Sequence, residues 1–122
     1  MAGGRVATAV RLAWTCAFLG GAFNHARDLL AGGWLPYRVA PLPLNIFWSA
    51  LLPVDLLVAA LLWWRPRWGV ALGVTVMLVD VAVNTEVVRR AGVPMHRMVQ
   101  LQILFLGFVL GSTPLLVTRS RR

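Results

Sequence analysis

Residues 45–64 have the sequence NIFWSALLPVDLLVAALLWW, and after the four residues RPRW a second apolar run, GVALGVTVMLVDVAVNTEVV, follows at 69–88. A hydrocarbon core about 30 Å thick is spanned by roughly 20 mostly apolar helical residues. The two runs therefore predict two membrane-spanning helices joined by a tight turn. The tryptophans and arginines of that turn favour the lipid–water interface.

The rest of the chain follows the same pattern. An apolar stretch at 7–30 ends before a Gly-Gly pair, and one at 94–117 begins with a proline suited to a first helical turn. Residues 34–44 contain three prolines and suit an interfacial loop. The sequence predicts one all-α domain over residues 1–122, an antiparallel four-transmembrane-helix bundle. The expected helices are 7–30, 45–64, 68–88 and 94–117.

The composition excludes several classes of protein. A chain of 122 residues with 59% hydrophobic side chains is too apolar to fold in water as one small domain. We therefore expect it to lie in a lipid bilayer, which is its first interaction partner. The net charge of +8 comes from arginines at the ends of apolar runs, which argues against a nucleic-acid-binding face. Cys16 is the only cysteine, so an internal disulfide, a paired-thiol redox centre and a thiolate zinc cluster are excluded. We expect neither a metal nor a cofactor.

The arginines also predict the orientation in the cell membrane. Seven would lie on one side and five on the other, which favours cytoplasmic termini. The seven are Arg5, Arg11, Arg65, Arg67, Arg119, Arg121 and Arg122, and the five are Arg27, Arg38, Arg89, Arg90 and Arg97. Alternatively, the run at 12–23 is a cleaved signal peptide, which would leave three spans.

Small residues recur at helical spacing, which allows close backbone approach within lipid. They are Ala13, Ala17 and Gly21 in the first helix, Gly69 and Gly73 in the third, and Gly107 and Gly111 in the fourth. At about 100° per residue, the same faces continue into polar side chains. These are Asn24 and Asp28, then Asp80 and Asn84, and finally Gln100 and His96. With cytoplasmic termini, every polar extension falls in the outer half of the bundle.

We therefore expect a polar cavity in the outer half. The predicted lining residues are Asn24, His25, Asp80, Asn84, His96 and Gln100, with Asn45 and Gln102 at the rim. In the second helix, Pro53 frees the carbonyl of Ser49, so that this carbonyl, the Ser49 hydroxyl and Asp55 could serve as oxygen ligands for a proton or a small cation. Asp55 lies about 120° from Ser49, however, so the face of this helix is less well defined.

Asp55 and Asp80 are the leading candidates for function. A charged carboxylate near mid-membrane costs at least about 2.5–3.5 kcal/mol, so it is either functional or well partnered. The structural alternative is that both carboxyls are hydrogen-bonded between helices. His25 is a third catalytic candidate, although a histidine at the membrane boundary can also lie simply among headgroups.

Other polar and aromatic residues have simpler interpretations. Glu86 precedes Arg89 and Arg90 by three and four residues, which predicts a structural ion pair, and Arg27 beside Asp28 suggests another. The tryptophans are expected to be interface anchors. They are Trp14, Trp34, Trp48, Trp63, Trp64 and Trp68.

The leading functional hypothesis is a membrane protein that binds a small polar or amphiphilic ligand, or relays protons, through a cavity centred on Asp80 and Asn84. One alternative is an intramembrane enzyme acting on a lipid or isoprenoid, with Asp80 or His25 as general acid or base. Another is a structural subunit whose glycine faces dock on a membrane-protein partner or on a second copy. The sequence carries no motif that distinguishes these alternatives.

Overall fold

The computed structural model describes residues 2–118, and within that range the chain is all-helical without a strand. The helices are α1 (Ala2–Gly32), α2 (Leu42–Trp64), α3 (Pro66–Ala91) and α4 (Arg97–Val117). All four are long and apolar enough to cross a membrane. The predicted four-helix transmembrane fold is confirmed, and the chain is built as a multi-pass membrane protein.

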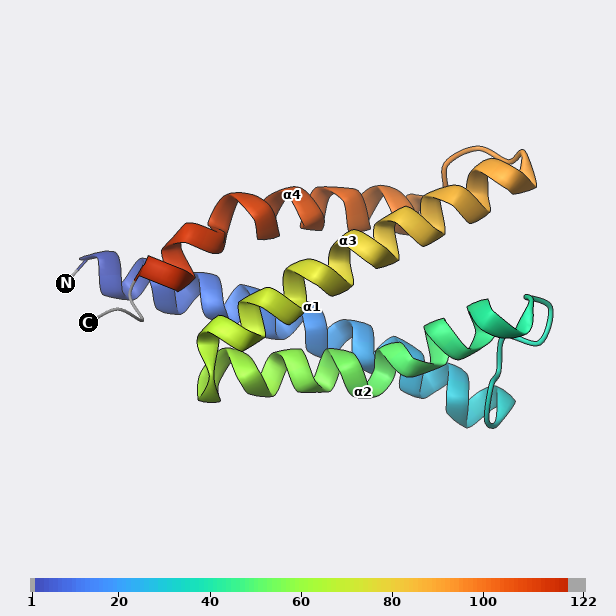
Figure 1. The fold of residues 1–122 in the computed structure, drawn as a ribbon, viewed down its shortest axis with the longest axis horizontal. Coiled ribbons are helices and arrows are strands. Elements are labelled where there is room, and N and C mark those ends of the chain that lie inside the picture. The colour runs from blue at the N-terminus through green and yellow to red at the C-terminus, as the bar shows by residue number, and fades with distance from the viewer. Residues whose placement is uncertain (1, 119–122) are drawn as a thin grey trace.

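The helices form an antiparallel bundle in which neighbours in the chain pack together and α1 closes the ring against α4 (Figure 1). The tight α2–α3 turn lies at the same end as the start of α1 and the end of α4, and we call this the turn end. The longer connections, 33–41 and 92–96, lie at the opposite end, the loop end. Arg119, Arg121 and Arg122, which were predicted to lie near the turn end, fall outside the described residues.

Helix boundaries differ from the expected ones where proline and capping groups act. α2 begins at Leu42 because a proline fits its first turn, whereas α4 begins only at Arg97. Before α4 the backbone of His96 is extended, and its Nδ1 accepts a hydrogen bond of 3.1 Å from the Met98 N–H. α3 ends at Ala91 and is capped by Gly92, whose φ of 65° is the left-handed conformation that glycine adopts without strain.

A continuous apolar core fills the half of the bundle nearer the turn end. Its members are Trp14, Phe18, Val58, Leu62, Val70, Met77, Val109 and Leu116. Trp14 is fully buried, and its indole N–H donates to the Ser112 hydroxyl at 2.9 Å, which joins α1 to α4. The interpretation of Trp14 as an interface anchor is therefore wrong. α1 buries Trp14 and Phe18, whereas Ala13 of the expected small-residue face is exposed.

The glycines of α3 permit close helix packing, but those of α4 do not. A Cβ at Gly69 would lie 2.5 Å from the Leu62 backbone nitrogen, and one at Gly73 would meet side chains of α1 and α2 at 3.1–3.3 Å. In contrast, a Cβ at Gly107 or Gly111 would meet no atom within 4 Å. The expected packing face of the fourth helix is therefore wrong, because another side of α4 faces the bundle.

Candidate functional site

The helix pairs α1–α2 and α3–α4 diverge toward the loop end (Figure 1), and a cavity of about 930 Å³ lies between them. All four helices and the 33–41 connection contribute to its lining. The polar lining residues are Asn24, His25, Arg27, Asp28, Tyr37, Trp48, Asp55, Asp80, Asn84, His96 and Gln102. The polar groups therefore lie in the half of the bundle nearer the loop end, which the apolar core does not fill.

The deep end of the cavity is apolar. Phe18 and Phe105 approach from α1 and α4 with ring centroids 5.9 Å apart in an edge-to-face arrangement. Val76 and Met77 of α3 add further apolar side chains to the lining. The cavity thus offers an apolar surface at its base and hydrogen-bonding groups above it.

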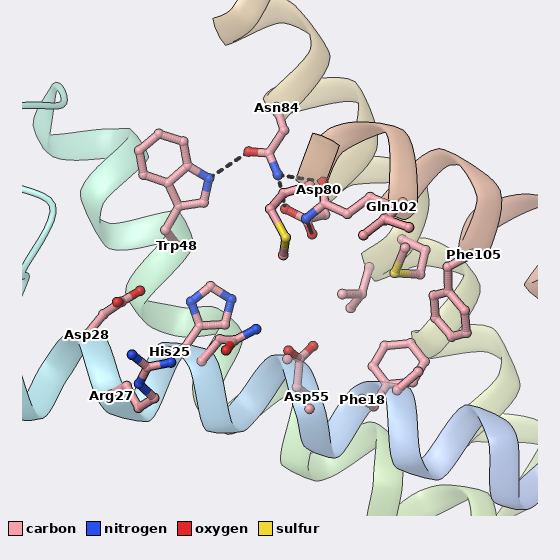
Figure 2. Close-up of a pocket in the computed structure, with 18 of the residues that line it drawn as sticks. Phe18, His25, Arg27, Asp28, Trp48, Asp55, Asp80, Asn84, Gln102 and Phe105 are labelled. Carbon is pink, nitrogen blue, oxygen red and sulfur yellow. Dashed lines mark hydrogen bonds between the residues drawn. The ribbon is translucent and has the colours of Figure 1, made fainter. Parts of the chain in front are cut away.

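Asp80 belongs to a hydrogen-bond network that joins three helices (Figure 2). The Asn84 amide group donates to Asp80 Oδ1 at 2.9 Å and to Gln102 Oε1 at 3.0 Å. Gln102 donates in turn to Asp80 Oδ2 at 3.2 Å, and the Trp48 indole N–H donates to Asn84 Oδ1 at 2.9 Å. Both oxygens of Asp80 are therefore satisfied, which lowers the cost of its burial.

Asp55 differs from Asp80 in its hydrogen bonding. Its side chain points into the cavity (Figure 2), and the residue is 7% exposed. No residue within the described range 2–118 donates a hydrogen bond to its carboxyl group. The carboxyl lies against α1 where that helix has Gly21, and a Cβ at this position would be 2.6 Å from Asp55 Oδ2. Gly21 therefore gives the carboxyl room in its present position, and a larger residue there would force the Asp55 side chain to turn.

A second polar chain lies at the mouth of the cavity. The Tyr37 hydroxyl donates to Asp28 Oδ2 at 2.6 Å, so its oxygen is free to accept a hydrogen bond of 2.9 Å from His25 Nδ1–H. This arrangement leaves His25 Nε2 with a lone pair. Burial, the hydrogen bond to Asp28 and the negative charge of Asp28 raise the pKa of Tyr37 above its ordinary value of 10.0.

Asn45 holds Tyr37 in place instead of lining the rim of the cavity. Its side-chain oxygen accepts a hydrogen bond of 3.0 Å from the Tyr37 backbone N–H, and its amide donates to the Leu35 carbonyl at 2.9 Å. The residue is buried under the 33–41 connection. Ser49 also lies outside the cavity lining, and its hydroxyl donates to Asn45 Oδ1 at 3.4 Å.

The structure brings together most of the side chains predicted for the site. Six of them line one cavity: Asn24, His25, Asp55, Asp80, Asn84 and His96. Two do not: Ser49, and Gln100, which is exposed and donates to the Met95 carbonyl at 3.4 Å. Gln102, expected only at the rim, is instead a central member of the Asp80 network.

The predictions for Gln100 and for the α4 glycines are wrong for the same reason, because both turn the wrong side of α4 toward the bundle. Two residues along a helix correspond to about 200° of rotation, so Gln100 and Gln102 point to opposite sides. The side of α4 that lines the cavity is that of Met98, Leu101, Gln102 and Phe105, at the spacing of one helical face.

Sequence reasoning also missed Trp48 and Tyr37. Trp48 was interpreted as an interface anchor, but its indole lines the cavity and packs edge-on against Tyr37 at 5.4 Å. A tyrosine in a proline-rich connection gives no signal in sequence that it folds back over the bundle. The expected pairing of Arg27 with Asp28 is replaced by the bond from Tyr37, whereas Glu86 forms its predicted ion pairs with Arg89 at 2.7 Å and with Arg90 at 2.6 Å.

Within residues 2–118, no three histidine, cysteine or acidic side chains are grouped so that they could hold a metal ion. Comparison with models of known protein families, with characterised proteins and with solved structures finds no match to this chain. The cavity and its side chains are therefore the basis on which a function can be assigned.

Proposed function

We propose that this protein binds a small amphiphilic molecule in the cavity between α1–α2 and α3–α4. The supporting observation is a cavity of about 930 Å³ with an apolar base and convergent polar groups. Ligand sites are typically about 300–1,000 Å³ and mostly apolar, with a few polar groups that fix orientation. The apolar part of the ligand would lie against Phe18 and Phe105, and its polar part would face Asp55 and Asp80.

The proposed orientation in the cell membrane follows from the arginine distribution. With both chain ends in the cytoplasm, the loop end and the mouth of the cavity face outward. A ligand would then enter from the outer leaflet or from the medium.

A second function, proton transfer to or from a bound substrate, is supported by the chain Asp28–Tyr37–His25. This chain leaves His25 Nε2 as a proton acceptor at the mouth of the cavity. An intramembrane enzyme on a lipid-like substrate would use His25 or Asp80 in this role. We place this second, because both oxygens of Asp80 already accept hydrogen bonds from Asn84 and Gln102, and because the Nδ1 of His25 is engaged with Tyr37.

The ligand-binding proposal can be tested by filling the cavity. Gly20 lines the cavity, and a Cβ there would meet no atom within 4 Å, so Gly20→Phe adds a side chain to free space. Gly107→Phe is the matched control, because Gly107 is equally open but lies outside the cavity. Each protein is extracted in polymer nanodiscs without detergent, and its co-purified small molecules are identified by mass spectrometry.

We expect an amphiphile in near-stoichiometric amount with the wild-type protein and with Gly107→Phe, and a strong depletion of it in Gly20→Phe. Equal amounts in all three proteins would contradict binding in this cavity. The bulk lipid that surrounds every nanodisc should be the same in the three samples and serves as an internal reference.

A further inference from the structure

Asp55 has hydrogen-bonding capacity that the protein itself does not use. The residue is 7% exposed and its carboxyl points into the cavity, yet no donor within residues 2–118 reaches it. Its unpartnered carboxyl oxygens are open to the cavity, so a molecule bound there can donate a hydrogen bond to them. Asp80 lines the same cavity, but both of its oxygens accept hydrogen bonds, one from Asn84 and one from Gln102. The two carboxyls therefore differ in hydrogen bonding although they share one cavity.

The charges facing the cavity are arranged at two depths. Asp55 and Asp80 lie deep, whereas His25, Arg27, Asp28 and His96 lie toward the loop end. The Asp55 carboxyl lies beside Gly21 of α1, so Gly21 has the same depth in the bundle as Asp55. Arg27 follows Gly21 by six residues, which places its backbone about 9 Å closer to the loop end along the helix axis. The acidic side chain at the mouth, Asp28, already accepts a hydrogen bond from the Tyr37 hydroxyl. Among the described residues, the deep carboxyls therefore have no cationic neighbour lining the cavity at their own level.

We propose that the ligand is an amphiphilic organic ammonium ion whose N–H group donates to the free carboxyl of Asp55, with its apolar part against Phe18 and Phe105. This inference rests on the proposed ligand-binding function and names the chemical class of its ligand. An ammonium supplies what Asp55 lacks, a hydrogen-bond donor and a positive charge.

Other ligand classes fit less well. An anion would meet two buried carboxyls and no deep cation. A metal ion would need further oxygen or nitrogen ligands, and no such group of three side chains exists within residues 2–118. A neutral amphiphile could fill the apolar base and donate a hydroxyl to Asp55, but it would bring no positive charge to a level of the cavity where, among the described residues, two carboxyls and no cation lie.

The test compares two probes that differ only in their polar group, 4-phenylbutylammonium and 4-phenylbutan-1-ol. Their binding to the full-length protein in phosphatidylcholine nanodiscs is measured by equilibrium dialysis at neutral pH, with empty nanodiscs to subtract partition into lipid. We expect the ammonium to bind at least about 10-fold more tightly than the alcohol, equivalent to about 1.4 kcal/mol.

Two variants and a control show whether the preference for the ammonium probe depends on Asp55. Asp55→Asn keeps the size of the side chain and should abolish the preference for the ammonium. Gly21→Ala keeps the carboxyl but places a methyl group 2.6 Å from the position of Oδ2, so it should also reduce the preference. Glu86→Gln removes one negative charge from an exposed ion pair outside the cavity and should leave the preference unchanged.

Equal binding of the two probes by the wild-type protein, or an unchanged preference in Asp55→Asn, would overturn the ammonium inference. Binding of neither probe would overturn it as well. The proposed ligand-binding function is decided separately by the Gly20→Phe experiment, so it can survive the failure of this inference. Circular dichroism and size-exclusion chromatography establish that each variant is folded, and Gly21→Ala replaces Asp55→Asn if the latter is not.

Discussion

The indole N–H of Trp48 donates a hydrogen bond of 2.9 Å to the side-chain oxygen of Asn84, which joins α2 to α3 across the wall of the cavity. Asn84 uses its amide group for Asp80 and for Gln102 of α4. The bond from Trp48 therefore completes a network over three helices, at a level where the apolar core no longer holds them together. We expect this network to set the width of the cavity.

Trp48→Phe should lower the free energy of unfolding by about 1 kcal/mol, because it removes the donor and leaves a partly buried acceptor unsatisfied. Trp68→Phe is the control, since Trp68 is 69% exposed at the turn end, and its effect should stay within about 0.5 kcal/mol. Reversible unfolding in mixed micelles measures both values. Similar losses for the two variants would mean that the Trp48–Asn84 bond contributes no stability of its own.

The two histidines should adopt opposite neutral tautomers. His25 donates from Nδ1 to Tyr37, whereas His96 accepts at Nδ1 from the Met98 N–H and so carries its proton on Nε2. Nitrogen-15 chemical shifts of the imidazole rings, recorded at a pH where both are neutral, distinguish these states. Tyr37→Phe should reduce the Nδ1–H population of His25 and leave His96 unchanged. Identical tautomers in the wild-type protein would contradict the Asp28–Tyr37–His25 chain.

Tyr37 is the only tyrosine in the chain, so its ionisation can be followed by ultraviolet difference absorbance. Because burial and Asp28 raise the pKa of Tyr37 above 10.0, phenolate should form only at a higher pH than in a free tyrosine. A raised pKa means that the folded state favours the neutral phenol. The stability it contributes is therefore complete below about pH 10 and is lost as the pH rises further.

Asp28→Asn should bring the Tyr37 titration closer to its ordinary position, because the variant removes the negative charge next to the hydroxyl. Glu86→Gln removes a charge from a different site, an exposed ion pair, and should not shift the titration. A titration that Asp28→Asn leaves unchanged would exclude Asp28 as a cause of the shift.

Gly73→Leu and Gly107→Leu should have very different effects on stability. A side chain at Gly73 meets Trp14, Val58 and Phe18 at 3.1–3.3 Å, so overpacking should cost at least about 1–3 kcal/mol. A side chain at Gly107 meets no atom within 4 Å and should be nearly neutral for the isolated bundle. The yield of monodisperse protein and its thermal unfolding measure this difference. Gly107→Leu has a second use, because loss of a membrane assembly without loss of folding would favour the structural-subunit hypothesis.

The number of helices and their membrane-spanning character were predictable from the sequence alone. Apolar runs of about 20 residues separated by arginines and prolines have few alternatives in a bilayer, because every backbone polar group must be satisfied within the helix. The depth of the polar residues was predictable for a related reason. The position of Asp55 or Asp80 along its helix fixes its depth once the ends of the helix are known.

The rotation of each helix about its own axis was decided only by the tertiary structure. α4 has apolar side chains on every side and carries Gln100 and Gln102 on opposite faces, so its sequence does not say which of the two faces turns inward. In the same way, the tryptophan composition indicates an interface, yet Trp14 is buried against Ser112 and Trp48 bonds to Asn84. Hydrophobicity alone does not distinguish lipid from a neighbouring helix, since both are apolar. Packing and interhelical hydrogen bonds make that distinction, and they exist only once all four helices are in place.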